Sequence, residues 1–142
     1  MLKYSISDQQ KKITPRIKIL LRRANFLISK IIKDEYFYDV NIVSSEKIKN
    51  INNKYRHNNK PTDVIAFAFH DANNIKTLLL GEIFINYQQA RKQTNASYEY
   101  EILFLFVHGL LHLLGFNHSN VSNRKQMFDL QNKIVQQSFI VR

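Results

Sequence analysis

Cysteine is absent from the sequence, and glycine and proline are scarce, with 3 and 2 residues respectively among 142. Without cysteine the chain can form no disulfide, no thiolate metal site and no thiol nucleophile, so a metal site must use His, Asp or Glu. Three glycines cannot build a glycine-rich phosphate-binding loop. We therefore expect no nucleotide cofactor.

Long hydrophobic runs are also absent. The longest purely apolar run extends from Ile102 to Val107, far short of the roughly 18 residues that a membrane-spanning helix needs. Residues 1–7 lack the apolar core of a signal peptide. The sequence therefore predicts a cytoplasmic protein that has no membrane partner.

Acidic residues are few compared with basic ones. The chain has 21 Lys and Arg against 11 Asp and Glu, a net charge of +10. Residues 1–33 hold nine basic and one acidic side chain, which leaves 12 basic and 10 acidic residues elsewhere. AT-rich codons, which favour Lys, Asn and Ile, would spread lysine along the chain, so the clustering favours a localised face that binds a polyanion such as RNA.

The remaining composition is that of a globular protein, with 44% hydrophobic and 23% charged residues. A chain of this length is typical of one domain, here residues 1–142. Hydrophobic periodicity and turn residues predict four strands, at residues 2–7, 38–43, 64–69 and 78–85. The same patterns predict five helices, which begin after Thr14, Ser44 or Ser45, Asn86, Ser97 and Ser122. We expect an α+β fold in which about five helices cover a small mixed sheet of four strands.

The first predicted helix, from Pro15 to about Lys33, is amphipathic and basic. Its apolar stripe comprises Ile17, Leu20, Leu21, Ala24, Leu27, Ile28 and Ile31. The residues expected to face outward are Arg16, Arg22, Arg23 and Lys30. A helix of this kind could also lie on a membrane surface, but we favour the sheet as its partner because the sheet needs an apolar cover.

Three histidines lie on and just beyond the most apolar predicted helix, residues 98–114. His108 and His112 are four residues apart and so share one helix face, while Gly115 allows a turn that returns His118 toward them. By chance, this triple spacing has a probability of about 0.006 in a chain of this composition. The pattern predicts a metal site on a central, buried helix.

Three neutral imidazoles suit zinc, with copper, nickel and cobalt as alternatives. They leave a tetrahedral ion one open position, which is typical of a catalytic site. The spacing is that of metzincin peptidases, but Gly109 stands where those enzymes carry a glutamate base. A peptidase is thus disfavoured, and the full charge of the ion suits an anionic phosphodiester.

Three segments resemble the YbeY family of endoribonucleases and rRNA maturation factors. The most specific is the run from His108 to His118, and the others are Tyr55-Arg56 with the stretch from Lys60 to Phe67, and Gly81-Glu82-Ile83. Two positions depart from the family pattern: Asn117 replaces an aspartate before the last histidine, and Ala66 replaces a serine. The available carboxylates are Asp63 and Glu82, and neither is assigned as the general base.

The resemblance implies a zinc-dependent endoribonuclease, specific for single strands, that acts in 16S rRNA 3′-end maturation and ribosome quality control. It implies one zinc ion per chain on His108, His112 and His118, with Arg56 and His108 as catalytic residues and Arg56 and Asp63 as substrate contacts. Single-stranded RNA, small-subunit rRNA, ribosomal proteins and a ribosome-associated GTPase are the implied partners. An RNA-binding assembly factor with a structural metal and, more remotely, a metalloprotease are the alternatives.

Overall fold

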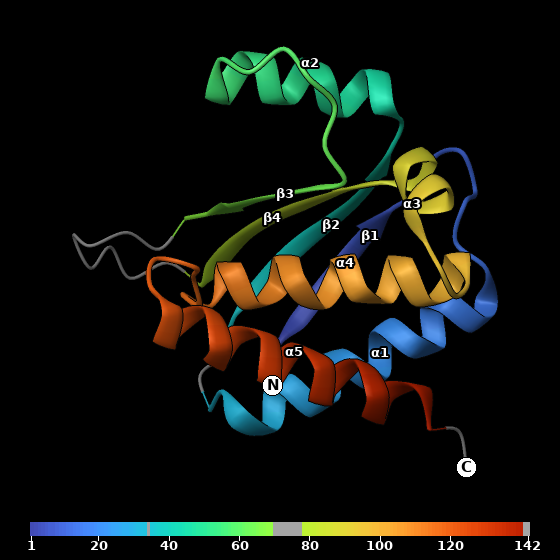
Figure 1. The fold of residues 1–142 in the computed structure, drawn as a ribbon. Coiled ribbons are helices and arrows are strands. Elements are labelled where there is room, and N and C mark those ends of the chain that lie inside the picture. Colours follow the sequence, from blue (N-terminus) through green and yellow to red (C-terminus); the bar gives the residue numbers. More distant parts are fainter. Residues whose placement is uncertain (34, 70–77, 141–142) are drawn as a thin grey trace.

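The computed structural model describes residues 1–33, 35–69 and 78–140 and has the predicted α+β architecture (Figure 1). Its strands are β1 (Lys3–Ser7), β2 (Phe37–Val43), β3 (Val64–Ala68) and β4 (Leu79–Asn86). Its helices are α1 (Pro15–Ile31), α2 (Ser45–Arg56), α3 (Tyr87–Gln93), α4 (Tyr98–Leu113) and α5 (Val121–Phe139). The polar loop predicted between β3 and β4 has its centre, residues 70–77, outside the described residues.

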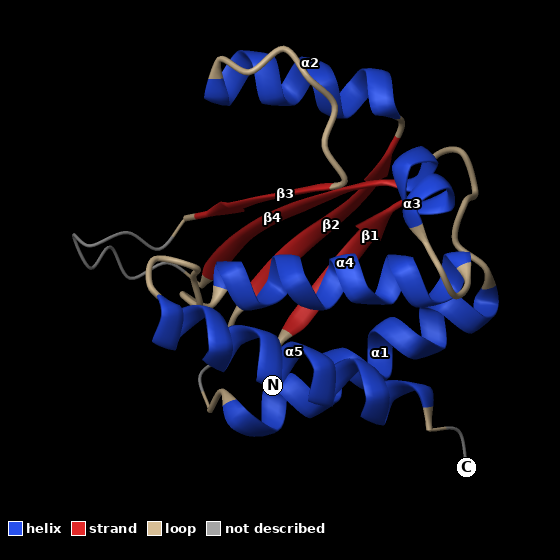
Figure 2. Ribbon diagram, viewed as in Figure 1, coloured by secondary structure: helices blue, strands red, loops and turns tan. Residues whose placement is uncertain are grey.

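The four strands form one mixed sheet in the order β1-β2-β4-β3. β1, β2 and β4 run parallel, whereas β3 pairs antiparallel with β4. Helices α1, α4 and α5 lie on one side of the sheet, and α2 lies on the other (Figure 2). We call the side that α1, α4 and α5 cover the inner face, and the side that α2 covers the outer face. Because strand side chains alternate between faces, β3 and β4 contribute to both.

The helix starts follow from local capping chemistry. The predicted caps Thr14, Ser44, Asn86 and Ser97 each accept a hydrogen bond from a backbone N–H of the first turn. The prediction for α5 was wrong by two residues. Asn120, rather than Ser122, caps this helix, because its Oδ1 accepts from the Asn123 N–H at 2.8 Å.

Helix α4 is the central element of the hydrophobic core, as its composition predicted. Nine of its residues are buried, and it contacts β3, β4, α1, α3 and α5. On the inner face, the buried hydroxyl of Tyr38 donates to Asn25 Oδ1 at 2.7 Å, and Asn25 Nδ2 donates to the Leu2 carbonyl at 2.8 Å. These bonds fix α1 to the sheet with the buried polar groups satisfied.

Most of the predicted apolar stripe of α1 is buried in this core, so its partner is the protein interior. Two details differ from prediction. Ile31, in the last turn, is 51% exposed. Arg23 is half-buried, and its guanidinium donates to the carbonyls of Ser138 and Ile140 at 3.3 Å. Among the described residues, no helix is long and apolar enough to cross a membrane.

Candidate metal centre

The three predicted histidines converge at the C-terminal end of α4. The ring centroid of His108 lies 4.7 Å from that of His112 and 5.4 Å from that of His118, and the last two are 5.1 Å apart. One ligand atom from each ring lies within 4.8 Å of the others. The three side chains could therefore bind one metal ion together.

The turn after α4 places the third imidazole. Gly115 has φ +101°, in the left-handed region that disfavours other residues. A Cβ at this position would meet no atom within 4 Å, so the backbone conformation alone requires glycine. The Phe128 ring, from α5, packs edge-on against His118 with centroids 5.5 Å apart.

Asn117, one of the two departures from the family pattern, organises the segment between α4 and α5. Its Oδ1 accepts hydrogen bonds from the backbone N–H and the hydroxyl of Ser119, at 3.0 and 2.6 Å, and from Asn123 Nδ2 at 3.2 Å. The amide thus ties the residue before His118 to the start of α5. An aspartate could accept the same bonds, so this departure leaves the loop geometry intact.

Burial keeps two of the imidazoles, those of His108 and His112, in the form that binds metals. Desolvation lowers the pKa of His108, and the same effect, with the neighbouring His108, His118 and Arg56, lowers the pKa of His112 to about 4. Both side chains are therefore neutral at pH 7. Neutral imidazole is the state that ligates a divalent ion.

Gln131, on α5, selects the tautomer of His108. Its Oε1 lies 2.7 Å from His108 Nδ1, so Nδ1 carries the proton and donates, which leaves Nε2 free for a metal. Gln131 is fully buried, and its Nε2 has no hydrogen-bond partner among residues 1–33, 35–69 and 78–140. Gln131 was not among the residues predicted from the sequence, although a glutamine four positions after Met127 on the buried stripe of α5 was a visible signal.

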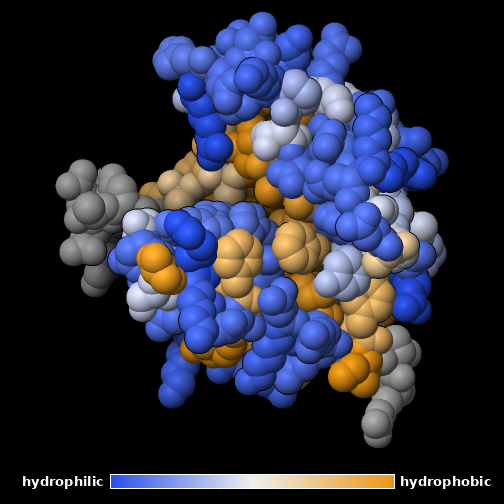
Figure 3. All heavy atoms as spheres, viewed as in Figure 1, coloured by the Kyte–Doolittle hydropathy of each residue, from blue (hydrophilic) through white to orange (hydrophobic). Residues whose placement is uncertain are grey.

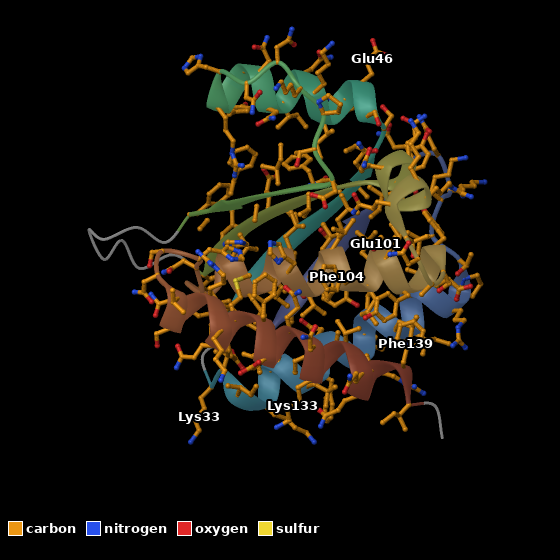
Figure 4. All side chains as sticks on the ribbon, viewed as in Figure 1. Lys33, Glu46, Glu101, Phe104, Lys133 and Phe139 are labelled. Carbon is orange, nitrogen blue, oxygen red and sulfur yellow. The ribbon has the colours of Figure 1, made fainter. Side chains whose placement is uncertain are left out.

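An aromatic row supports the opposite side of His108. The Phe104 ring is nearly parallel to the His108 ring, at 11° with centroids 6.5 Å apart, and Tyr100 follows one turn earlier. Phe104 and Phe139 lie along the boundary between α4 and α5 (Figure 4). The imidazole is thus held by packing on one side and by a hydrogen bond on the other.

The donor set fits a metal ion. Three imidazole nitrogens within 4.8 Å of one another suit zinc and other borderline cations. A buried amide fixes one ligand in the manner usual for histidines at metal sites. We conclude that His108, His112 and His118 could hold a divalent ion.

The packing of Gly109 explains why the peptidase glutamate is absent. A Cβ at this position would lie 2.8 Å from Ile83 Cγ2 on β4. A side chain here would therefore collide with the sheet. The close approach of α4 to β4 excludes a general base at the position where metzincins carry one.

Arg56 and Asp63 line the same hollow as the three histidines. This hollow has a volume of about 310 Å³ and is lined by Arg56, Asp63, Val64, Ala66, Gly109 and the three histidines. We call it the metal pocket. Ala66, the other departure from the family pattern, faces into it, so the missing hydroxyl removes a polar group from its wall.

Two side chains fix the segment that carries Asp63. Gln93 Nε2 donates to Asp63 Oδ2 at 3.0 Å. The buried Asn86 binds the same segment, since its backbone N–H donates to the Asp63 carbonyl at 2.8 Å and its Nδ2 donates to the Thr62 carbonyl at 3.1 Å. The Asp63 carboxylate is thus held at the pocket wall.

Glu82 belongs to the opposite face. Its neighbour Ile83 is fully buried on the inner face, and Glu82 lines a separate hollow beneath α2. Of the two carboxylates considered from the sequence, only Asp63 lies in the metal pocket.

The basic face predicted on the first helix lies away from α2. Lys33, just after α1, and Lys133, on α5, project from the helical layer on the side opposite α2 (Figure 4). Arg16 is paired with Glu99 at 3.0 Å, and Arg23 is bound to carbonyl groups. Lys18 and Arg22 remain exposed. The polyanion-binding role of α1 stays a prediction.

Comparison with known proteins gives a consistent picture. The family model described as Endoribonuclease YbeY matches residues 4–138. A relative of that name from Ureaplasma urealyticum serovar 10 is 44% identical over 123 residues, which cover 84% of this chain and 79% of the relative. Another of that name from Acholeplasma laidlawii is 38% identical over 138 residues, with coverages of 95% and 96%. The solution structure of TM1509 from Thermotoga maritima is similar, with a TM-score of 0.61, 26% identity and coverages of 98% and 89%.

Proposed function

The chain belongs to the YbeY endoribonuclease family, and from this we propose that it is a zinc-dependent endoribonuclease that cleaves single-stranded RNA. One observation supports the proposal most strongly. Three imidazoles and one guanidinium line the same hollow of about 310 Å³. A site of this kind combines a place for one zinc ion per chain with a binding group for phosphate.

His108, His112 and His118 would hold the ion. When bound, zinc supplies Lewis-acid polarisation of a phosphoryl oxygen. The part of His108 is to present Nε2 in a fixed orientation, because Gln131 holds its Nδ1 proton. For this reason we count His108 among the catalytic residues.

Arg56 binds the scissile phosphate. Its planar guanidinium can donate two hydrogen bonds to two phosphate oxygens, a geometry that lysine lacks. The charge on those oxygens grows as the phosphodiester reacts, so Arg56 stabilises the transition state more than the substrate. Its proximity to the triad is reflected in the pKa of His112, which Arg56 lowers.

Asp63 contacts the substrate through an acceptor interaction. Gln93 donates to Oδ2 of this carboxylate. Oδ1 lies 3.5 Å from the Thr62 hydroxyl and can accept a further hydrogen bond from a ribose 2′-hydroxyl. The 2′-hydroxyl is the group that distinguishes RNA from DNA. Asp63 would thus favour RNA over DNA at the pocket.

The family also suggests the biological role. We propose that residues 1–142 act as one metal-dependent endoribonuclease domain in 16S rRNA 3′-end maturation and ribosome quality control in the cytoplasm. Small-subunit rRNA, ribosomal proteins and a ribosome-associated GTPase are its proposed partners.

The test combines metal content with cleavage. Purified protein is analysed by elemental mass spectrometry and incubated with single-stranded and duplex fragments of the 16S 3′ region. We expect about one zinc per chain and cleavage of the single strand only. A His108→Ala, His112→Ala variant should lose both the zinc and the cleavage, and activity that persists in it would indicate a contaminating nuclease.

The same samples distinguish an assembly factor with a structural metal. A chelator should remove zinc from an open catalytic site and leave the chain folded, whereas loss of a structural ion unfolds its domain. We expect the circular dichroism spectrum to be retained after chelation. Unfolding on chelation, combined with RNA binding and no cleavage, would favour the assembly factor.

A further inference from the structure

A second hollow lies on the outer face of the sheet, between α2 and strands β3 and β4. Its volume is about 710 Å³, more than twice that of the metal pocket. Figure 3 shows apolar side chains gathered in the space between α2 and the rest of the molecule. We call it the α2 groove, and its size is within the range of ligand-binding cavities.

Aromatic rings form much of its lining, namely Tyr55, Phe67, Phe69 and Phe84. Tyr55 and Phe69 are 60% and 42% exposed. The Phe67 ring makes edge-on contacts with Tyr55 and Phe84, with centroids 5.4 and 6.0 Å apart. We call the four rings together the aromatic platform, in which Tyr55 and Phe69 are exposed and Phe67 and Phe84 are partly buried. Sheet-borne aromatic platforms of this kind stack nucleobases in RNA-binding domains.

The charge at the groove suits a polyanion. Lys47 and Lys54, both exposed, line it from α2, against one carboxylate, Glu82, from β4. The Lys54 ammonium lies 5.2 Å from the centroid of the Tyr55 ring, so a charge for phosphate and a surface for a base lie side by side. Glu82 cannot bind phosphate, but a carboxylate accepts hydrogen bonds from base amino groups.

The α2 groove adjoins the metal pocket, since Ala66 lines both hollows. Arg56 lines the pocket, and its guanidinium carbon lies 5.7 Å from the centroid of the Phe67 ring, which lines the groove. At the other end, a cavity of about 410 Å³ shares Lys47 and Phe84 with the groove and extends over β2 to Gln10 and Asn41. These hollows form a path from the triad, past Arg56 and across the outer face.

We propose that the α2 groove binds the nucleotides that flank the scissile phosphate, with their bases on the aromatic platform and their phosphates at Lys47 and Lys54. This inference rests on the proposed function, because it takes single-stranded RNA as the substrate. It gives that specificity a physical basis, since paired bases have no free faces to stack on side chains. A duplex would therefore not occupy the groove.

The first test is binding of a 12-nucleotide single-stranded RNA that carries 2-aminopurine, whose fluorescence falls when it stacks. We expect quenching with wild-type protein, and a Kd about tenfold higher for the Tyr55→Ser, Phe69→Ser variant. Phe26→Ser is the matched control, since Phe26 on α1 is 47% exposed. The KM for cleavage should rise with the Kd, while kcat should change little.

The second test is salt dependence. Removal of two phosphate contacts in the Lys47→Gln, Lys54→Gln variant should reduce the slope of log Kd against log salt by about 1.4. Lys18→Gln, Lys133→Gln is the control pair, on α1 and α5. A slope that falls only in the control pair would overturn the proposal in favour of the helical layer.

The third test locates the strand directly. RNA that carries 5-iodouridine is photo-crosslinked to the zinc-loaded protein, and the modified peptide is identified by mass spectrometry. Crosslinks to Tyr55 or Phe69 support the proposal, and crosslinks confined to α1 overturn it. A different outcome would also overturn the proposal: RNA affinity that is unchanged in the groove variants, together with octalysine binding that depends on Glu82. That result would indicate a basic protein partner for the groove.

These outcomes separate the two proposals. If the protein binds RNA through the groove but does not cleave it, the endoribonuclease assignment fails and the groove assignment stands. If the protein cleaves RNA and both groove variants retain the wild-type KM and Kd, the groove assignment fails alone.

Discussion

The two hollows on either side of β3 differ in size and chemistry although one strand contributes to both walls. The metal pocket on the inner face is small, and its wall holds three imidazoles, a guanidinium and a carboxylate. The α2 groove on the outer face is larger, and aromatic rings and lysines line it. Val64 lines only the metal pocket and Phe67 lines only the α2 groove, whereas Ala66 lines both. Because side chains alternate along β3, the proposed catalytic site and the proposed base-binding surface lie on opposite faces of one strand.

The difference also extends to rigidity. Two of the three histidines lie on α4, at the centre of the core, and Gln131 and Phe104 contact His108. The platform depends on a surface helix and on exposed rings. We infer that positional precision is concentrated at the pocket, where chemistry needs it, and that the groove can adapt to different bases.

Loss of the triad should have the largest effect, and it should abolish the function of the metal pocket without affecting the α2 groove. We expect His118→Ala to reduce kcat by at least about 10³-fold, because several kcal/mol of charge stabilisation are lost with the metal. The 2-aminopurine quenching in the α2 groove should persist. Kinetics and fluorescence on one preparation measure both.

His57→Asn is the matched control, since His57 is an exposed histidine at the end of α2 and asparagine tolerates its left-handed φ of 55°. This variant should keep its zinc. Loss of groove binding in His118→Ala, with His57→Asn unaffected, would contradict the independence of the two hollows.

Arg56 lies where the two hollows meet, so its substitution shows whether it acts in catalysis at the metal pocket or in RNA binding at the α2 groove. We expect Arg56→Gln to reduce kcat by about 10²-fold, because a preorganised donor to the reacting phosphate is lost. Arg56→Lys should be intermediate, since a lysine keeps the charge and loses the bidentate geometry. Single-turnover cleavage at saturating RNA measures the change. A higher KM at unchanged kcat would assign Arg56 to the groove.

Substitution of Gln131 tests how much the buried hydrogen bond to His108 contributes to zinc affinity. Gln131→Leu removes the acceptor for the His108 Nδ1 proton, and we expect zinc affinity to fall by about 10- to 100-fold. Gln131→Glu keeps an acceptor and should retain more of the affinity. Competition with a chromophoric chelator measures both. Equal affinities in the two variants would show that the tautomer of His108 needs no partner on α5.

The smallest expected effect is on the pH dependence of stability. The pKa of His112 is lowered from 6.5 to about 4 and that of His108 is also lowered, so between these pH values the unfolded chain binds protons that the folded chain does not. The unfolding free energy of the metal-free protein should therefore fall as pH drops from about 6.5 toward 4. These two groups should cause no change above pH 7.

Urea unfolding at pH 7.5, 6.0 and 4.5 measures this slope. His112→Gln should flatten it, because the other titrating groups are common to both proteins. A slope that is the same in the variant and the wild type would mean that His112 is solvated in the metal-free state.

The sequence alone predicted those features that depend on local chemistry. Four of the five helix caps were predicted correctly, because a cap needs only a side-chain oxygen and the next turn. The triad was predicted because two ligands share a helix face and Gly115 permits one particular turn. The cap of α5 was wrong because Ser119, Asn120 and Ser122 all offer an oxygen, and only the path of the loop selects Asn120.

What the sequence left open depends on which residues meet across the fold. The partner of Gln131 is 23 residues away in sequence, and a polar residue on a buried stripe does not disclose what it binds. Glu82 remained a candidate base because the sequence does not show which face of β4 carries the histidines. The α2 groove had no signal of its own, since its aromatic rings come from three separate elements and meet only when α2 lies over the sheet.

The way α2 is attached has a consequence for heat inactivation. Its buried residues are Ile48 and Asn52, with Asn52 Nδ2 donating to the Lys60 carbonyl at 2.9 Å. We therefore expect α2 to detach while the core stays folded. Arg56 is its last residue and would leave the pocket with it. Activity should therefore decline on warming before α4 unfolds and return on cooling, and amides of α2 should exchange with deuterium before those of α4.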